Sequence, residues 1–224
     1  GFETSEIILE MELPGTRPPL HEMVTGGRVA SIRRLIDAGV DPNLTDYKGW
    51  TALHYTASYH DCPEVAKFLL SRGAKVDART KAGVTPLGVA ARYSGERMVR
   101  AILDAGANVN ARDIDGYTPL SHAVWDGPLV TANLLIKNGA MVDIFSAVGL
   151  GDAQKLEALL KVDPAHAHRT DGKGRGLVHW AAANGKIDII KMLHKAGVKV
   201  DDALEGIPTP LAVAIEKGWR ETAE

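Results

Sequence analysis

The sequence predicts an all-α solenoid, in which short helix-turn-helix units stack side by side without one central core. Five glycines give the first signal, because they recur at spacings of 34, 33, 33 and 58 residues. The last interval exceeds one period by 25 residues, so it contains one shortened unit. Self-similarity at a fixed period is typical of repeat architectures. These glycines, which follow apolar stretches, are Gly39, Gly73, Gly106, Gly139 and Gly197.

A second motif recurs in step with the glycines. Its threonine can cap the free N–H groups at the start of a helix. Its proline suits the first helical position, where the missing N–H costs nothing. Two independent series at one period therefore predict that each unit begins with a short helix. The copies are Pro19-Leu20-His21, Thr51-Ala52-Leu53-His54, Thr85-Pro86-Leu87, Thr118-Pro119-Leu120, Leu177-Val178-His179 and Thr209-Pro210-Leu211.

A second helix is expected later in each unit. Met98, Val99 and Ile102 place apolar side chains at helical spacing in the third unit. The recurrent glycine after them suits the left-handed residue that ends a helix. A polar stretch then closes in Asp115-Gly116, a tight-turn signal, so a projecting turn joins consecutive units.

This pattern resembles the ankyrin repeat family over roughly residues 18–224. The Thr-Pro-Leu-His motif of the family appears as Thr51-Ala52-Leu53-His54 and as Thr85-Pro86-Leu87-Gly88. Its characteristic ending appears as Gly106-Ala107-Asn108-Val109-Asn110. The resemblance implies a concave face, made from the turn tips and the ends of the first helices, that usually binds another protein.

We expect residues 16–224 to form one domain, and residues 1–15 to form an N-terminal cap or extension. Seven repeats would start near residues 16, 49, 83, 116, 142, 174 and 207. The fifth lacks the turn and the Thr-Pro segment, and Asp163-Pro164 replaces its glycine, which predicts a bend or gap at mid-chain. The seventh stops part-way through its second helix, which suggests a fragment or an end that packs on something else.

Composition argues against several classes of protein. The chain carries 26 Lys and Arg against 28 Asp and Glu, so nucleic-acid binding is not expected. No apolar run approaches the roughly 18 residues of a membrane span, so no membrane insertion is expected. The single cysteine, Cys62, excludes an internal disulfide framework. A cytoplasmic location is favoured, and a removed signal peptide is the alternative because the chain begins at Gly1.

No constellation of residues predicts catalysis, a cofactor or a metal site. Repeat stacks lack the closed cavity that usually holds an active site. Three histidines share one motif position, which predicts hydrogen bonds to backbone between units, and they are His21, His54 and His179. His166 and His168 are two metal ligands without a third. Residues 171–176 are glycine-rich but lack the spacing of a phosphate-binding loop, so we expect a turn.

Aromatic side chains mark the candidate binding face. Six of the twelve aromatics fall on tips or first-helix ends of repeats two to four, where the resemblance places partner contacts. Core positions hold Ala, Leu, Val and Ile, so we expect these rings to lie outside the core. Tyr and Trp bury a large area and lose little rotamer freedom on binding. The candidate residues are Tyr47, Lys48, Trp50, Tyr59, Lys81, Arg92, Tyr93, Asp115, Tyr117, Trp125 and Asp126.

The resulting hypothesis is a non-enzymatic module that binds an unidentified protein or peptide. Several alternatives remain open at this point. The aromatics could instead stiffen the stack, or cage a cationic group such as methylated lysine. The chain could be a targeting or regulatory domain of a larger enzyme or effector, or a small-ligand receptor that uses the same aromatics. A monomer is expected, with association through the uncapped C-terminal end as the alternative.

Overall fold

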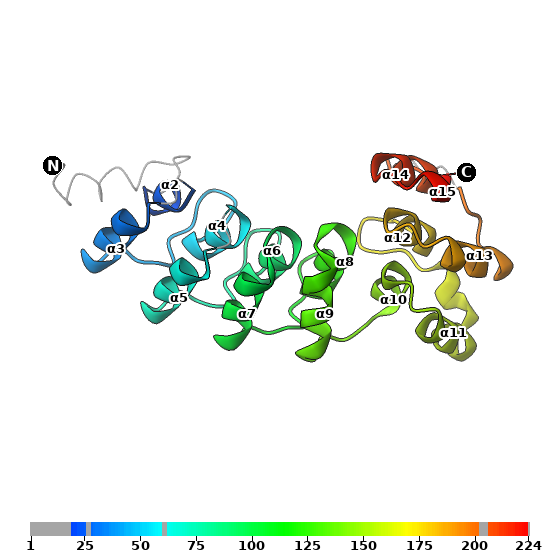
Figure 1. Ribbon diagram of the computed structural model, residues 1–224, viewed down its shortest axis with the longest axis horizontal. Coiled ribbons are helices and arrows are strands. Elements are labelled where there is room, and N and C mark those ends of the chain that lie inside the picture. The colour runs from blue at the N-terminus through cyan, green and yellow to red at the C-terminus, as the bar shows by residue number, and fades with distance from the viewer. Residues whose placement is uncertain (1–18, 26–27, 60–61, 202–205, 224) are drawn as a thin grey trace.

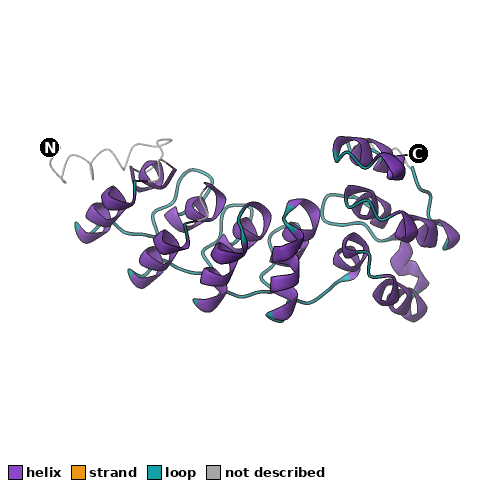
Figure 2. Ribbon diagram, viewed as in Figure 1, coloured by secondary structure: helices purple, strands orange, loops and turns teal. Residues whose placement is uncertain are grey.

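The computed structural model describes residues 19–25, 28–59, 62–201 and 206–223. All regular elements in these residues are helices, joined by loops and turns (Figure 2). A single isolated bridge pairs Thr170 with Gly176 across one turn. The fold is therefore all-α, as predicted. The cap expected for residues 1–15 lies outside the described residues.

The helices follow one another in pairs, and the pairs form an elongated stack (Figure 1). A 3-10 helix, η1 (Pro164–His168), lies between the fifth and sixth pairs. The pairs are α2 (Pro19–Thr25) with α3 (Val29–Asp37), α4 (Ala52–Tyr59) with α5 (Pro63–Ser71), α6 (Pro86–Tyr93) with α7 (Glu96–Asp104), α8 (Pro119–Asp126) with α9 (Leu129–Lys137), α10 (Ile144–Leu150) with α11 (Ala153–Val162), α12 (Leu177–Ala183) with α13 (Ile187–Lys195), and α14 (Pro210–Glu216) with α15 (Arg220–Ala223).

The two recurrent motifs act as predicted at the helix ends. The Thr85 side chain accepts a hydrogen bond from the Gly88 N–H at 3.3 Å, and proline follows at the first helical position. Thr118 caps α8 in the same way, accepting from the Ser121 N–H at 3.2 Å. The five recurrent glycines all have φ between 86° and 93°, a left-handed conformation that other residues rarely adopt.

Histidines of the shared motif join neighbouring pairs. His54 Nε2 lies 3.1 Å from the Val84 carbonyl oxygen of the following pair. His21 Nε2 lies 3.1 Å from the Leu44 carbonyl oxygen. The predicted structural role is confirmed for these two histidines. Burial lowers the pKa of His54 to about 4, so its imidazole is neutral at physiological pH.

Leucines, valines and alanines from successive helices form the core as two adjoining clusters, one over α2 to α5 and one from α4 onward, with Leu53, Leu87 and Leu120 completely buried. The expectation that the six candidate aromatics lie outside this core is wrong for Tyr117, which is 9% exposed. Two aromatics outside the candidate set are also buried, with Trp180 1% and Tyr55 5% exposed. The polar atom of each of these buried side chains has a hydrogen-bond partner: the Tyr55 hydroxyl, the Tyr117 hydroxyl and the Trp180 indole N–H each bond another side chain.

The stack changes direction at the fifth pair (Figure 1). No Thr-Pro segment precedes α10; instead the Asp143 side chain caps this helix by accepting from the Ser146 N–H at 2.8 Å. The connection from α9 to α10 is therefore short, and no projecting turn forms there. Beyond this point α10, α12 and α14 lie one above another, and the loop before α12 extends back toward α8. The predicted mid-chain bend is present.

Candidate functional site

Four projecting turns form the edge of the candidate binding face. We name each after the helix that follows it: the α4, α6, α8 and α12 tips. A backbone hydrogen bond of 2.9 to 3.1 Å closes each tip, and a glycine at φ between 76° and 82° makes the reversal in each. The tips span residues 46–50, 80–84, 113–117 and 171–175.

A buried aspartate fixes the α4 tip to its helix. Asp46 accepts hydrogen bonds from the Lys48 and Trp50 N–H groups, both at 2.8 Å. Its second oxygen accepts from the Tyr55 hydroxyl at 2.6 Å, nine residues further along the chain. The tip is thus held rigidly over α4 before any partner arrives, which reduces the ordering cost of binding.

The same arrangement recurs at two further tips. In the α8 tip, Asp113 accepts backbone bonds, and its other oxygen lies 3.0 Å from His122 Nε2. In the α12 tip, Asp171 accepts from the Trp180 indole at 2.9 Å. Aspartate and ring donor are nine residues apart in each case. The α6 tip has Thr80 in place of aspartate and valine nine residues later, so carboxylate and donor are lost together.

These hydrogen bonds keep the three carboxylates ionised. Burial would raise the pKa of Asp171, but the Trp180 indole, the Arg175 N–H and the Arg175 charge outweigh it and lower the pKa. The pKa of Asp113 is also lowered despite burial, mainly by His122. For Asp46 the Tyr55 hydroxyl has the same effect. The tips therefore carry fixed, internally satisfied charges that are not free to bind a partner.

Consecutive tips are joined by their backbones. The Lys81 N–H donates to the Lys48 carbonyl oxygen at 2.9 Å, which links the α6 tip to the α4 tip. The Ile114 N–H donates to the Ala82 carbonyl oxygen at 3.1 Å, which links the α8 tip to the α6 tip. The three tips thus form one continuous edge, and Lys48 and Lys81 are exposed on it.

An open aromatic groove lies beside this edge, and we call it the tyrosine groove. Lys48, Trp50, Tyr55, Ser58, Tyr59 and Tyr93 line a hollow of about 400 Å³. Tyr59 is 57% exposed and Tyr93 56%, whereas the buried Tyr55 supports the floor. The rings are in contact, with centroids 5.1 Å apart for Trp50 and Tyr55 and 6.1 Å for Tyr55 and Tyr59. Tyr47 is 61% exposed at the tip itself.

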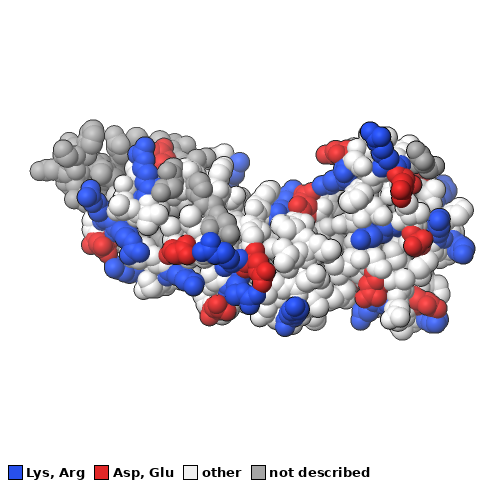
Figure 3. Space-filling view, in the orientation of Figure 1, with Lys and Arg blue, Asp and Glu red and all other residues white. Residues whose placement is uncertain are grey.

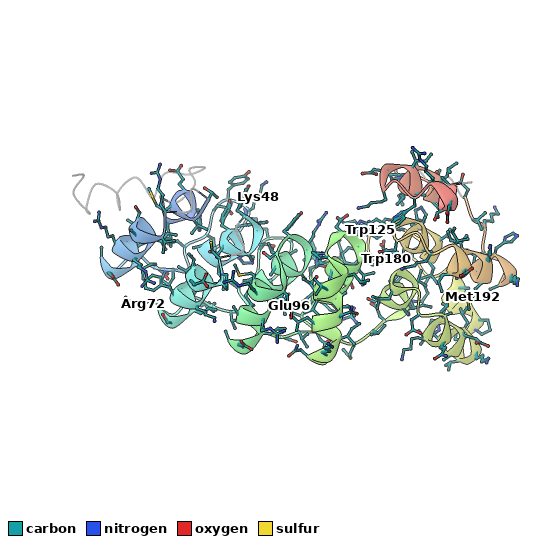
Figure 4. All side chains as sticks on the ribbon, in the orientation of Figure 1. Lys48, Arg72, Glu96, Trp125, Trp180 and Met192 are labelled. Carbon is teal, nitrogen blue, oxygen red and sulfur yellow. The ribbon has the colours of Figure 1, made fainter. Side chains whose placement is uncertain are left out.

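The predicted residues around α8 have a different environment. Tyr117 is buried and accepts a hydrogen bond from Arg175 Nη2 at 2.8 Å. The Arg175 guanidinium lies 3.5 Å above the Trp125 ring, and the Trp125 and Trp180 centroids are 4.9 Å apart. Figure 4 shows Trp125 and Trp180 together between α8 and α12, far from Lys48. We call these four residues the arginine cluster.

The acidic candidates of this region are also occupied by intramolecular contacts. Asp126 forms ion pairs with both Arg92 and Lys217. Asp115 lies 3.8 Å from the Lys173 ammonium. The structure thus divides the predicted residues into two groups. The tyrosines and lysines of the α4 and α6 units stay open. Trp50 packs partly against the core, and the residues of the α8 unit and Arg92 contact other parts of the chain.

The sequence reasoning missed Arg175, Trp180 and Lys217. Arg175 is 58 residues from Tyr117, and Lys217 is 91 residues from Asp126, so neither pair follows the repeat period. The only available signal was the 25-residue excess in the glycine spacing, which shows that a turn is missing but not what replaces it.

On the face shown in Figure 3, the charged side chains of the described residues do not gather into one patch. Positive and negative side chains alternate over the visible face (Figure 3). In the described part of the chain, no group of three His, Cys, Asp or Glu side chains is arranged to hold a metal ion. Helices long and apolar enough to span a bilayer are also absent from these residues.

Comparisons with known proteins agree with this architecture. The family model for ankyrin repeats (3 copies) matches residues 6–80 and 76–146, more than half of the chain. SH3 and multiple ankyrin repeat domains protein 2 of Homo sapiens is 32% identical over 207 residues, which cover 88% of this chain and 11% of that protein.

Shorter matches point the same way. Neurogenic locus notch homolog protein 4 of Homo sapiens is 45% identical over 85 residues, or 38% of this chain and 4% of that protein. Protein phosphatase 1 regulatory subunit 27 of Homo sapiens is 33% identical over 85 residues, or 38% of this chain and 54% of that protein. The chain therefore spans from a few per cent to about half of the length of these relatives.

Ankyrin repeats generally mediate protein–protein interaction, and they are typically non-enzymatic although some matched relatives are named as enzymes. The repeated motifs, the helix pairs and the matching model agree. The chain belongs to the ankyrin repeat family.

Proposed function

We propose that this chain is a non-enzymatic interaction module that binds a protein or peptide through the concave face of helix pairs α4/α5 to α8/α9. One observation carries the proposal: the tyrosine groove leaves two half-exposed tyrosines beside a rigid row of tips. Tyrosine and tryptophan are enriched among the residues that dominate binding energy. The tips need no reordering, so little binding free energy is lost on rigidifying them.

The α8 unit contributes differently from what its sequence suggests. Tyr117 and Asp126 stabilise the fold, and the half-buried Trp125 presents only part of its ring. We therefore place the main contacts at Tyr47, Tyr59 and Tyr93, with Lys48 and Lys81 as charged neighbours. The same surface would serve if the module targets or regulates a larger protein, because that role also begins with binding a partner.

A peptide library tests this proposal. The immobilised protein is used to select binders from a displayed library of random 15-residue peptides, and affinities are measured by fluorescence anisotropy. We expect Tyr59→Ala and Tyr93→Ala each to weaken selected peptides at least about tenfold, as truncation of a central aromatic contact does. Leu129→Ala is the matched control, since Leu129 is 60% exposed but lies on α9 away from the groove.

Circular dichroism verifies that the tyrosine variants keep their helical content. Both side chains are more than half exposed, so their truncation leaves the core intact. Selected peptides whose affinity is unaffected by both tyrosine variants would show that the concave groove is not the binding face. Failure to select any peptide above background would count against the module itself.

A further inference from the structure

The tyrosine groove has a polar lining rich in hydrogen-bond donors: an indole N–H, an ammonium and tyrosine hydroxyls, which can also accept. The Trp50 indole N–H and the hydroxyls of Tyr59 and Tyr93 make no hydrogen bond to another residue that the structure describes. Lys48 adds an ammonium group, which only donates. Asp46, beneath the groove, is buried and already accepts from three donors. A ligand that fits this lining must supply acceptors.

We propose that the groove binds a proline-rich segment in the polyproline II conformation, flanked by an acidic residue; this rests on the proposed function. A polyproline helix has free carbonyl acceptors and no internal hydrogen bonds, and its prolines have no N–H to satisfy. Such segments dock in grooves lined by aromatic side chains. Donors and rings in the groove therefore match the acceptors and apolar rings of the ligand.

The groove geometry suits an extended ligand. The rings of Trp50, Tyr55 and Tyr59 form a continuous row, and the planes of Tyr55 and Tyr59 are within 16° of parallel. Tyr93, from the next helix pair, completes the lining. One face of the Tyr93 ring is covered by the Arg92 guanidinium at 5.0 Å, which orients the ring and leaves its other face for contact. A row of rings suits the prolines of a polyproline helix, which has three residues per turn.

Charge selects the flanking residue. Lys48 lines the groove, and its ammonium lies 5.4 Å from the centre of the Tyr47 ring. Lys81 is exposed on the adjoining tip. No carboxylate lines the hollow in the described residues, so a cationic ligand such as methylated lysine meets repulsion and no counter-ion. Glutamate or aspartate next to the prolines would instead pair with Lys48.

Other peptide conformations use the lining less well. An amphipathic helix satisfies its own backbone groups and leaves the groove donors unpaired. A β-strand presents N–H groups alternately with carbonyls, and the described lining offers those N–H groups only hydroxyl oxygens and no carboxylate. Unpaired polar groups at an interface weaken binding, so both conformations are disfavoured.

Synthetic fluorescent peptides test the inference with the full chain. An octaproline peptide preceded by two glutamates is compared with a glycine-serine peptide of equal length and charge, and with octaproline preceded by two lysines. We expect the acidic octaproline to bind at least about tenfold tighter than the glycine-serine peptide, and tighter than its basic counterpart. Tyr93→Ala should remove at least about tenfold of this affinity, and Leu129→Ala should change nothing.

Two further variants separate ring, donor and charge. Tyr93→Phe keeps the ring and removes the hydroxyl donor, so we expect a loss of about threefold to tenfold, the net value of one hydrogen bond. Lys48→Glu should reverse the preference between acidic and basic octaproline. Equal binding of the glycine-serine and octaproline peptides would overturn the inference. Library peptides that need Tyr59 and Tyr93 but lack proline would also overturn it, and would leave the interaction module standing.

Discussion

The two halves of the stack hold their projecting edge in different ways. From α4 to α9, each tip touches the next through a single backbone hydrogen bond, as in Lys81 to Lys48. From α10 onward one tip is missing, and the α12 tip crosses the gap to the α8 tip. There the hydrogen bonds and ring contacts come from the side chains of Arg175, Tyr117 and Trp125, and the Gly172 backbone packs closely against Asp115.

This difference shows how the units on either side of a shortened repeat can be bridged. Large rings and a guanidinium span the gap, and Trp180, the fully buried tryptophan of the core, lies among them. The same contacts engage Tyr117 and Trp125, the aromatic residues of the α8 unit. The regular half therefore retains open tyrosines, and the irregular half uses its aromatics for stability.

The largest effect should come from Arg175, which connects the two halves. Its side chain is 15% exposed and pairs with an Asp171 carboxylate that is 1% exposed. Arg175→Ala leaves that buried charge without its cation, so we expect a loss of about 3 kcal/mol in the free energy of unfolding. Urea denaturation followed by tryptophan fluorescence measures it.

A matched variant in the regular half provides the control. Arg97 also forms an ion pair, with Glu64, but both side chains are about two-thirds exposed. Arg97→Ala should change stability by less than about 0.5 kcal/mol. Equal effects of the two substitutions would mean that the arginine cluster does not hold the irregular half in place.

A pH titration probes the regular half through His54. Its folded pKa is about 4, because burial opposes the charged form. The unfolded chain takes up this proton near pH 6.5 and the folded chain does not, so stability present above pH 6.5 is lost as pH falls toward 4. We expect a slope of about 1.4 kcal/mol per pH unit in that range.

His54→Gln removes the titrating group and serves as the comparison. The variant should have a lower stability at pH 7 and a flatter profile between pH 6.5 and 4, measured as urea midpoints across that range. Parallel profiles for the two proteins would contradict a buried neutral His54.

Among the contacts of the irregular half, a smaller effect is expected at Lys217, whose ammonium pairs with Asp126, 91 residues earlier in the chain. Both side chains are partly exposed, so Lys217→Ala should cost no more than about 1 kcal/mol. A double-mutant cycle with Asp126→Asn isolates the pairwise energy. A second cycle with Arg72→Ala and Asp37→Asn measures an exposed pair of the regular half, and its coupling energy should be close to zero. A coupling energy larger for Arg72–Asp37 than for Lys217–Asp126 would contradict the expected difference between the two halves.

The fold could be predicted from the sequence because its signals are local and repeated. Thr118 and Pro119 start a helix through their own backbone chemistry, and Gly106 ends one through its φ angle. Such signals need no knowledge of distant residues. The shortened fifth unit was predictable for the same reason, since its missing Thr-Pro segment is visible in the chain.

The candidate site was only partly predictable. Tyr59 and Tyr93 lie on the open face because their positions within a regular unit fix their direction. Tyr117 ends the α8 tip, the position that Trp50 has in the α4 tip, and it is buried because Arg175 reaches it from a unit two pairs away. Exposure in a repeat protein depends on the neighbouring units, and a deletion changes which units are neighbours.

One consequence concerns how the chain folds and unfolds. A stack with only nearest-neighbour contacts can lose its end units one at a time. Gly172 passes so close to the α8 tip that an added Cβ would lie 2.1 Å from the Asp115 carbonyl oxygen. The Lys217 side chain pairs with Asp126 at the end of α8, 91 residues earlier in the chain. The last three pairs therefore share contacts with α8 as well as with each other. Their dissociation should be concerted, and their formation should be slow, because a long loop must close before those contacts form.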